Sequence, residues 1–312
     1  MAAKRILLIS NPVAGRRRGK LLLAKAKAQL EALGHSTTAE LTNASGHATH
    51  LARANAPDFE IVAALGGDGT VNEVTNGLMA IEPSKRPTLG VFPTGTGNDV
   101  AQTLGLTHFE TAIDALAKGN TRTLDVIRVK LIRHGAAVTR YALLFVAAGF
   151  AAEVIRKTGP RMKRIFGRRF SYSVGLFRAL ASFRAPKFKV KWNEQEKQEM
   201  MFQVCAGNTE FAGGGVMRLS PGAQPDDGLL DISLVDALGR LQIVQRFPSI
   251  LSGRYVEDER VDYFTDKRLE IDAEPPTEIQ ADGDIIGTTP ATIELLPGAL
   301  QLIIPEPIKN AI

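Results

Sequence analysis

Short, nearly all-apolar runs alternate with helix-like segments along the first 125 or so residues. Strands are predicted at residues 4–9, 36–41, 60–65 and 88–92, and helices at residues 20–33, 45–55 and 71–80 and after residue 97. Apolar strands that alternate with helices are typical of a parallel sheet covered on both faces. In such α/β sheets ligands bind beyond the carboxyl ends of the strands.

The pattern changes after Thr121, where strands bounded by turns take over. They are predicted at residues 123–132, 138–147, 187–192, 200–206, 229–235, 268–272, 277–281 and 291–296. Two helix-like segments, at about 151–183 and 241–252, interrupt this series. Short strands separated by turns predict an antiparallel β-sandwich, so the 312 residues are expected to form two domains.

Three of the predicted parallel strands end in loops rich in glycine and short polar side chains, at residues 10–15, 66–70 and 93–99. Glycines without a Cβ let backbone N–H groups approach phosphate oxygens, and the helix predicted from Val71 adds the positive end of its dipole. Hydroxyl and amide contacts would come from Thr70, Thr94, Thr96 and Asn98. The loops therefore predict a polyphosphate site.

One acid, Asp68, lies within the second of these loops. A carboxylate repels phosphate unless Mg²⁺ lies between them, so a Mg²⁺-bound nucleotide is expected. Common nucleotide motifs do not fit: Gly15-Arg-Arg-Arg-Gly19-Lys20 is one residue too short for a P-loop, and no G-x-G-x-x-G follows a strand.

Composition favours a soluble globular protein, since 44% of the residues are hydrophobic and the longest relevant apolar run, residues 141–152, is too short to cross a bilayer. Residues 1–9 are interpreted as a strand, not a signal peptide. Cys205 is the only cysteine, so no internal disulfide can form, and a cytoplasmic protein is expected.

Positive charge is concentrated in one segment. From Val154 to Asn193 the chain has twelve Lys and Arg residues and no Asp or Glu, interleaved with large apolar residues. This mixture favours an anionic membrane surface, contacted from Arg156 to Lys191, over nucleic acid. A solvated charged helix face is the simpler alternative.

The motif Gly66-Gly-Asp-Gly-Thr-Val-Asn-Glu73, with Pro93-Thr-Gly-Thr-Gly-Asn-Asp99, resembles the catalytic-domain family of diacylglycerol kinases, in particular the bacterial YegS/DgkB-type soluble lipid kinases. The likeness continues in residues 207–215, in residues 220–231 and in Ala281-Asp-Gly-Asp284. It therefore covers nearly the whole chain in order.

The resemblance implies a phosphofructokinase-like ATP-binding α/β domain at residues 1–122, to which the tail from about 300 to 312 returns, and a lipid-binding β-sandwich at residues 123–299. Together with the loop residues above, the expected nucleotide contacts are Asn11, Thr42, Gly66, Gly67, Asp68, Gly69, Thr70, Asn72, Glu73, Thr94, Gly95, Thr96, Asn98 and Asp99.

By the same resemblance, a structural Mg²⁺ would bind Asp227 and the backbone carbonyls of Gln224 and Leu229. The catalytic base matches Asp284, where many family members have glutamate, and Asp68 is a second candidate. The implied reaction transfers the γ-phosphoryl group of ATP to a primary hydroxyl of a lipid, diacylglycerol or phosphatidylglycerol, by a cytoplasmic enzyme peripheral at the inner membrane surface.

Two alternatives stay open at this point. An NAD kinase shares the Gly-Gly-Asp-Gly-Thr loop, although residues 71–73, 213–215 and 226–228 favour the lipid branch. The second alternative is a membrane-associated protein that binds a nucleotide or a lipid without catalysis. The three intact phosphate loops argue against it. The sequence leaves open the identity of the lipid and whether the protein is a homodimer.

Overall fold

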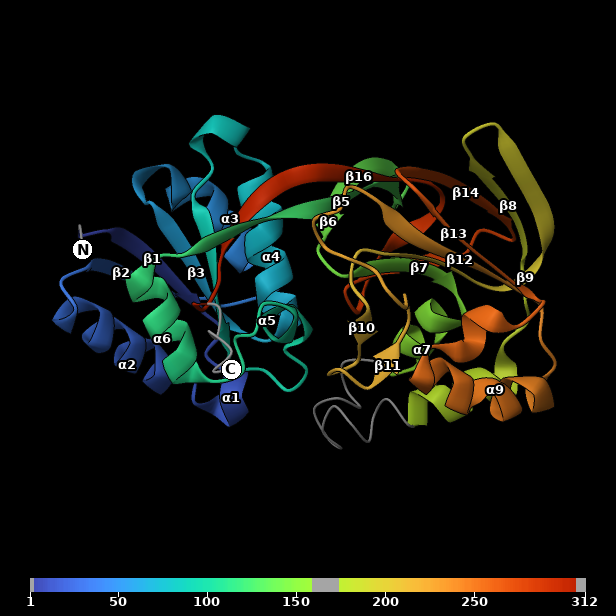
Figure 1. Ribbon diagram of the computed structural model, residues 1–312, viewed down its shortest axis with the longest axis horizontal. Coiled ribbons are helices and arrows are strands. Elements are labelled where there is room, and N and C mark those ends of the chain that lie inside the picture. The colour runs from blue at the N-terminus through green and yellow to red at the C-terminus, as the bar shows by residue number, and fades with distance from the viewer. Residues whose placement is uncertain (1–2, 159–173, 307–312) are drawn as a thin grey trace, which may run out of the picture. The chain divides into compact units, whose positions relative to one another are not determined.

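Two sheets of different kinds make up the fold in a computed structural model, which describes residues 3–158 and 174–306 (Figure 1). By its contacts the chain divides into unit 1, Met1–Leu124 with Gly298–Ile312, and unit 2, Asp125–Pro297. The chain passes from one unit to the other within β5 (Thr121–Arg133) and β16 (Asp284–Ile303).

Unit 1 is built on a parallel sheet with the strand order β4-β3-β1-β2, beyond which the end of β16 pairs with β4. The strands are β1 (Arg5–Ser10), β2 (Ser36–Leu41), β3 (Ile61–Gly66) and β4 (Thr88–Pro93). Every residue of β3 is buried, which explains its continuous apolar sequence.

Helices cover both faces of this sheet (Figure 1). On one face α2 (Gly19–Ala32) packs with α6 (Phe109–Lys118), and on the other α3 (His47–Asn55) packs with α4 (Asp68–Met79). The remaining short helices are α1 (Ala14–Arg17), η1 (Ala56–Asp58), η2 (Pro83–Lys85) and α5 (Asp99–Thr103).

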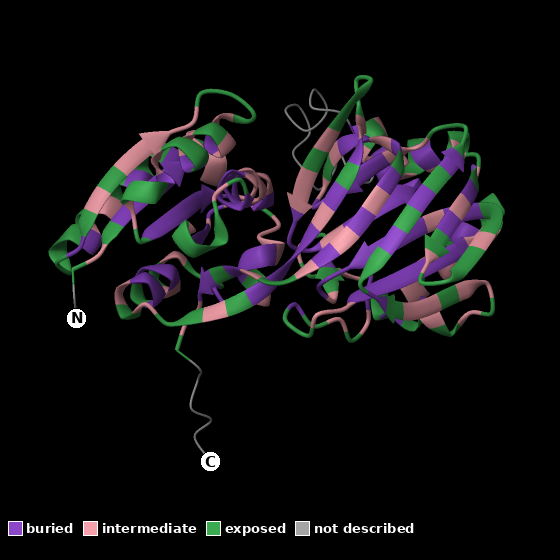
Figure 2. Cartoon of the chain, turned by 90° about the horizontal axis from the view of Figure 1, so that it is seen from above, coloured by how far each residue is buried: buried purple, intermediate pink, exposed green. Residues whose placement is uncertain are grey.

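Unit 2 is an antiparallel sandwich whose strands alternate buried and exposed positions (Figure 2). One layer runs β13-β12-β9-β7-β15-β16; β8 and β14 connect β9 to β16, and β5 pairs with β16 and β6. The bounds are β6 (Ala136–Ala142), β7 (Phe145–Gly149), β8 (Lys187–Trp192), β9 (Gln195–Gly207), β12 (Leu230–Asp236), β13 (Val261–Asp266), β14 (Arg268–Glu274) and β15 (Glu278–Ala281). Side chains from β5 to β9, β12 and β14 to β16 form one apolar core between the layers.

A second, smaller core lies between this sandwich and helices (Figure 1). It joins α7 (Phe150–Thr158), a helix at residues 174–182, α9 (Arg240–Ser252) and η3 (Arg254–Glu257) to the sheet. Phe150 stacks on Phe202 with 4.6 Å between ring centroids, and the ring of Phe183 meets Phe150 edge-on at 5.3 Å. A short hairpin, β10 (Phe211–Ala212) with β11 (Met217–Arg218), completes the unit.

The predicted fold class is confirmed in both parts, a parallel α/β sheet followed by an antiparallel sandwich. The strand predicted at residues 291–296 is a fragment of β16, and β13 was not predicted. Of the basic segment, residues 159–173 lie outside the described residues. In the described ranges, no helix is both long enough and apolar enough to cross a membrane. Cys205 is buried, and burial raises the pKa of its thiol to about 12.

The hairpin between β15 and β16 turns at Asp282 and Gly283, both with positive φ (47° and 88°), as a two-residue type I′ turn requires. The buried Asp282 carboxylate accepts backbone N–H groups from Leu143 (2.8 Å), Leu144 (3.0 Å) and Phe145 (3.1 Å). This carboxylate therefore attaches the hairpin to the segment that leads into β7.

Asp282→Asn is expected to lower the free energy of unfolding of unit 2 by about 2–4 kcal/mol. The amide removes the negative charge and replaces one of the two accepting oxygens by an NH2 group, which then faces a backbone N–H donor. Asparagine tolerates positive φ, so the turn itself is preserved. Urea unfolding followed by the fluorescence of Trp192, which stacks on Phe264 in unit 2, measures the change. The exposed Asp284→Asn is the matched control, and an equal loss in both variants would contradict the anchoring role.

Candidate functional site

The sheet register brings the ends of the parallel strands of unit 1 to one edge. Ser10 lies opposite both Leu41 and Leu65, and Gly66 lies opposite Pro93. Two predicted contacts begin at the same edge: the N–H of Asn11 donates to the Leu65 carbonyl (3.2 Å), and that of Thr42 to the Ser10 carbonyl (2.9 Å). The three glycine loops are therefore neighbours.

A buried carboxylate ties the second loop to the third. Asp68, at the start of α4, is 4% exposed. Its Oδ2 accepts the N–H of Asn98 (2.9 Å) and its Oδ1 that of Val100 (3.4 Å), so it caps the N-terminus of α5. The Asn98 side chain closes the third loop by accepting the Gly95 N–H (2.7 Å) and donating to the Gly95 carbonyl (3.1 Å).

Two glycines of these loops are required by close approach. A Cβ placed on Gly95 would lie 2.3 Å from the Cα atom of Gly67, and one on Gly66 would lie 2.2 Å from Thr70 Oγ1. Real side chains do not approach so closely, so these positions admit only glycine without movement of the backbone. The second and third loops are packed directly against each other.

The first loop also lies against the third. A Cβ on Gly15 would be 3.4 Å from the Thr94 carbonyl oxygen, and one on Gly19 would be 2.0 Å from the carbonyl oxygen of Asn11. The Asn11 side chain accepts the N–H of Val13 (3.1 Å), which folds the loop at the end of β1. All three loops thus form one continuous backbone surface.

This surface fits a phosphate-bearing ligand. The N-terminus of α4 has no side-chain cap, and the first N–H groups of a helix have no partner within it. The Thr94 side chain is 7% exposed, and its hydroxyl has no hydrogen-bond partner among the described residues. Thr96 is exposed, and a hollow lies beside the third loop, lined by Pro93, Asn98, Gln102, Leu106 and Thr107.

Two predicted nucleotide contacts have other partners. The Glu73 carboxylate accepts the N–H groups of Gly46 (2.8 Å) and Ala48 (3.1 Å) and so caps α3. Asn72 accepts from the Asn76 side chain, one turn further along α4. Both residues belong to the helix that follows the loop, and Glu73 fixes how α3 packs beside α4.

A polar cluster in unit 2 includes the predicted metal residues. Asp227 Oδ1 accepts the N–H of Leu229 (3.0 Å), while Gln224 and Asp227 are exposed. Asp125, which is buried and was missed from the sequence, accepts the Gly228 N–H (2.7 Å) and donates its own N–H to the Pro225 carbonyl (2.8 Å). Asp125 thereby fixes the turn on which Asp227 lies.

Charge around this turn fits a cation. Burial raises the pKa of Asp231, the negative charge of Asp227 raises it further, and a hydrogen bond from the Tyr263 hydroxyl (2.8 Å) opposes both effects. Among the described residues no group of three or more His, Cys, Asp or Glu side chains converges on a metal. The predicted site instead combines a carboxylate with backbone carbonyls, all oxygen donors of the kind Mg²⁺ binds.

Asp284 is exposed at the first position of β16. Its hairpin is held by Asp282 on the segment 143–145, and Asn208 binds that segment from another strand end. The buried Asn208 side chain donates to the Asp125 carbonyl (3.1 Å) and the Leu143 carbonyl (3.0 Å). Asn208 and Asp282 were both missed as site residues, although each lies in a motif already noted in the sequence.

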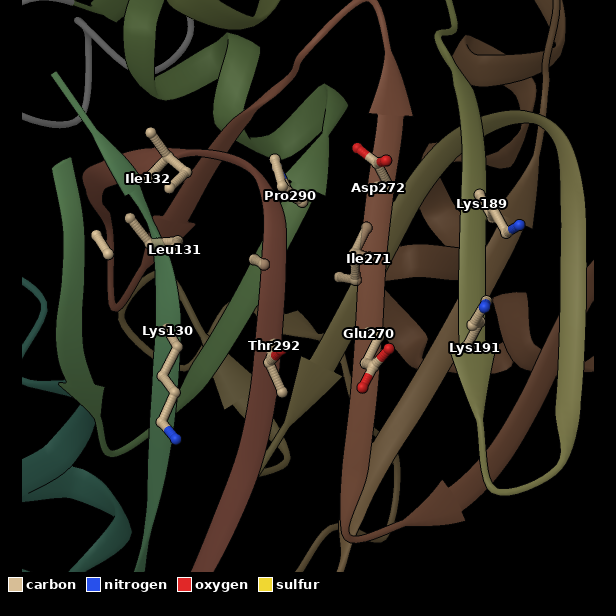
Figure 3. A pocket seen from close by; sticks show the side chains of 12 residues that line it. Lys130, Leu131, Ile132, Lys189, Lys191, Glu270, Ile271, Asp272, Pro290 and Thr292 are labelled. Atoms are coloured by element: carbon tan, nitrogen blue, oxygen red, sulfur yellow. The ribbon is translucent and has the colours of Figure 1, made fainter. Parts of the chain in front are cut away.

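A separate hollow lies over β5, β16, β14 and β8 (Figure 3). Lys189 and Lys191 on β8 lie opposite Asp272 and Glu270 on β14, so charges of both signs alternate across it. None of the predicted nucleotide, metal or catalytic residues lines this hollow, although Lys189 and Lys191 belong to the segment predicted to contact the membrane.

Comparison with protein families agrees with this geometry. The family profile described as the diacylglycerol kinase catalytic domain matches residues 5–129, and that of the YegS C-terminal NAD kinase beta sandwich-like domain matches residues 144–304. The chain belongs to the diacylglycerol kinase family. The family predicted from the sequence motifs is thus confirmed.

Several relatives align with nearly the whole length of this member of the diacylglycerol kinase family. The diacylglycerol kinase of Bacillus subtilis is 28% identical over 97% of each chain, and that of Staphylococcus epidermidis is 29% identical over 98% of this chain and 94% of its own. A crystal structure of a candidate diacylglycerol kinase from Bacillus anthracis has a TM-score of 0.78 and 29% identity, covering 97% and 96% of the two chains. Yeast NADH kinase, at a TM-score of 0.52 and 10% identity over 99% of this chain and 85% of its own, shares the fold alone.

Gly95→Ala is expected to weaken ATP binding at least about tenfold, because the added methyl group must push the third loop away from Gly67. Isothermal titration of the full-length protein with ATP measures the affinity. Gly239→Ala is the control, since its Cβ would meet only the tip of Gln242 at 3.5 Å. Unchanged affinity in Gly95→Ala would contradict the assignment of these loops to the nucleotide.

Proposed function

We propose that this chain is an ATP-dependent lipid kinase whose acceptor is the primary hydroxyl of diacylglycerol, with phosphatidylglycerol as the second candidate. The observation that carries the proposal is the junction at Asp68, where three glycine loops and the start of α4 form one surface. The full-length similarity to proteins named diacylglycerol kinase supports the choice of acceptor.

The triphosphate would be held by the backbone N–H groups at the start of α4 and by Thr70, Thr94 and Thr96. When bound, ATP supplies the phosphoryl group and its Mg²⁺ neutralises charge on it. Asp99 offers a carboxylate at this edge for that ion. We assign Asp68 a positioning role, because each of its oxygens already accepts a backbone N–H.

Asp284 is the proposed base. As the lipid hydroxyl oxygen bonds to the γ-phosphorus, its proton passes to the Asp284 carboxylate, and the bond from that phosphorus to the bridging oxygen breaks to release ADP. The hairpin turn that carries Asp284 is held rigidly by the three N–H groups bound to Asp282. Positioning of this kind supplies most of the rate enhancement in phosphoryl transfer.

The enzyme is further proposed to meet its lipid at an anionic membrane surface, to which the segment from Arg156 to Lys191 contributes positive charge. In the described part of that segment Arg178 and Arg184 are exposed. Lipid phosphates attract such a segment by about 1 kcal/mol for each Lys or Arg close to the surface.

Asp284→Asn is expected to reduce phosphoryl transfer at least about a hundredfold while ATP still binds, because an amide cannot accept the hydroxyl proton. Transfer of radiolabel from ATP with Mg²⁺ to diacylglycerol, phosphatidylglycerol or a ceramide in mixed micelles measures this and identifies the acceptor. Asp272→Asn, an exposed aspartate of the same unit, is the control. Bound ATP with no label in any lipid would sink the kinase assignment.

Mg²⁺ is expected to raise the melting temperature of unit 2 in the wild type but not in Asp227→Asn, because a ligand of the folded state stabilises it by mass action, by about 2.7 kcal/mol at a hundred times its dissociation constant. Trp192 fluorescence during thermal unfolding reports the shift. Asp226→Asn is the neighbouring control. An equal shift in Asp227→Asn would place the ion elsewhere.

A further inference from the structure

Helix α9 presents exposed apolar side chains along one of its faces. Leu241, Val244, Pro248 and Leu251 follow the helical spacing i, i+3, i+7, i+10. The side chains of Leu241, Val244 and Leu251 are 69%, 57% and 38% exposed. Ile243, on the other side of the helix, is buried in the small core. An ordinary amphipathic helix would have polar residues along the exposed stripe.

The helix at residues 174–182 adds a second apolar group at the same end of unit 2. Leu176 and Leu180 pack into the small core that also holds Ile243 of α9, so the two helices share one support, and they are neighbours in Figure 1. Phe177 lies on the outer side and is 70% exposed. Single exposed apolar residues are common on proteins, but four on two helices that share a core form a patch.

The two helices that carry this patch have positive charges and no negative ones. Residues 174–186 and α9 contain Arg178, Arg184, Arg240 and Arg246 and no Asp or Glu. Arg246 is paired with Asp258 (2.6 Å), whereas Arg184 and Arg240 are exposed. If this face paired with its copy about a two-fold axis, arginines would meet arginines, so the charge argues against a dimer here.

We propose that α9 and the helix at residues 174–182 form a docking surface for an anionic lipid bilayer. Phe177, Leu241, Val244 and Leu251 enter below the headgroups, and the exposed Arg184 and Arg240 contact lipid phosphates. The proposal rests on the proposed function in naming the surface by which a lipid kinase reaches its acceptor. It adds α9, which lies outside the basic segment, as the principal apolar contact.

The test is cosedimentation of the full chain, without ATP, with vesicles of phosphatidylglycerol and phosphatidylcholine or of phosphatidylcholine alone. Wild type is expected to bind the anionic vesicles, and more weakly as salt rises. The double variant Leu241→Gln, Val244→Gln is expected to lower the partition coefficient about tenfold or more. Leu21→Gln with Leu33→Gln is the matched control, since Leu21 (61% exposed) and Leu33 (55%) lie on unit 1.

Phe177→Gln gives an independent check from the other helix, and Trp192 fluorescence confirms that each variant is folded. Wild-type binding by the folded double variant, or no binding of wild type to anionic vesicles, would overturn the proposal. A dimer in lipid-free solution that the double variant dissociates would overturn it as well, in favour of a second copy.

A kinase assay separates this proposal from the proposed function. If both hold, the double variant phosphorylates short-chain diacylglycerol dispersed in water at the wild-type rate and diacylglycerol in anionic vesicles about tenfold more slowly. If only the docking proposal holds, the wild type still binds anionic vesicles more tightly than the double variant does, but neither protein phosphorylates any lipid. If the wild type and the double variant phosphorylated vesicle diacylglycerol at equal rates, the kinase assignment would stand and the docking surface would be refuted.

Discussion

The proposed nucleotide site depends on two hydrogen bonds, those that the buried Asp68 carboxylate accepts from the backbone N–H groups of Asn98 and Val100. Burying a charge is costly unless charged hydrogen bonds compensate for lost water, and here two backbone N–H groups do so. Glycine-rich loops lose much conformational freedom on ordering. Fixing the third loop to the start of α4 therefore keeps the Thr94 hydroxyl and the helix N-terminus in one arrangement before any ligand binds, which reduces the ordering that binding requires.

Unit 2 uses the same device around its own turns. Asp282 holds three consecutive N–H groups and Asp125 holds that of Gly228, in each case with a glycine in the turn that the acid secures. Glycine gives these turns their geometry and a buried acid makes them rigid. Three buried acids, Asp68, Asp125 and Asp282, thus hold backbone N–H groups of neighbouring segments, whereas Asp227 and Asp284 are exposed.

Sequence patterns predicted the order of strands and helices in both units, and the parallel arrangement was enough to place three loops at one edge of a sheet. They did not predict what Asp68 and Glu73 bind, because the partners lie 30 and 27 residues away and depend on how loops and helices pack. Asp282 was missed for the same reason, since its partners are 137 to 139 residues earlier in the chain. The helix α9 was predicted, but which of its faces is exposed was not, because apolar residues lie on both the buried and the exposed side of the helix.

In the proposed docking surface, different side chains of α9 pack into the core of unit 2 and contact the bilayer. Ile243 and Ile250 attach α9 to the small core with Phe150 and Phe202, whereas Leu241 and Val244 are largely exposed and are not among the described residues of that core. Substitution of the outer side chains therefore leaves the support of the helix intact. Because apolar contact with a bilayer gives no sequence-specific recognition, the surface can bring the enzyme to lipid without selecting the acceptor. If Asp284 is the base, as proposed, selection of the lipid falls to the region around it, where Asp282 holds the hairpin in place.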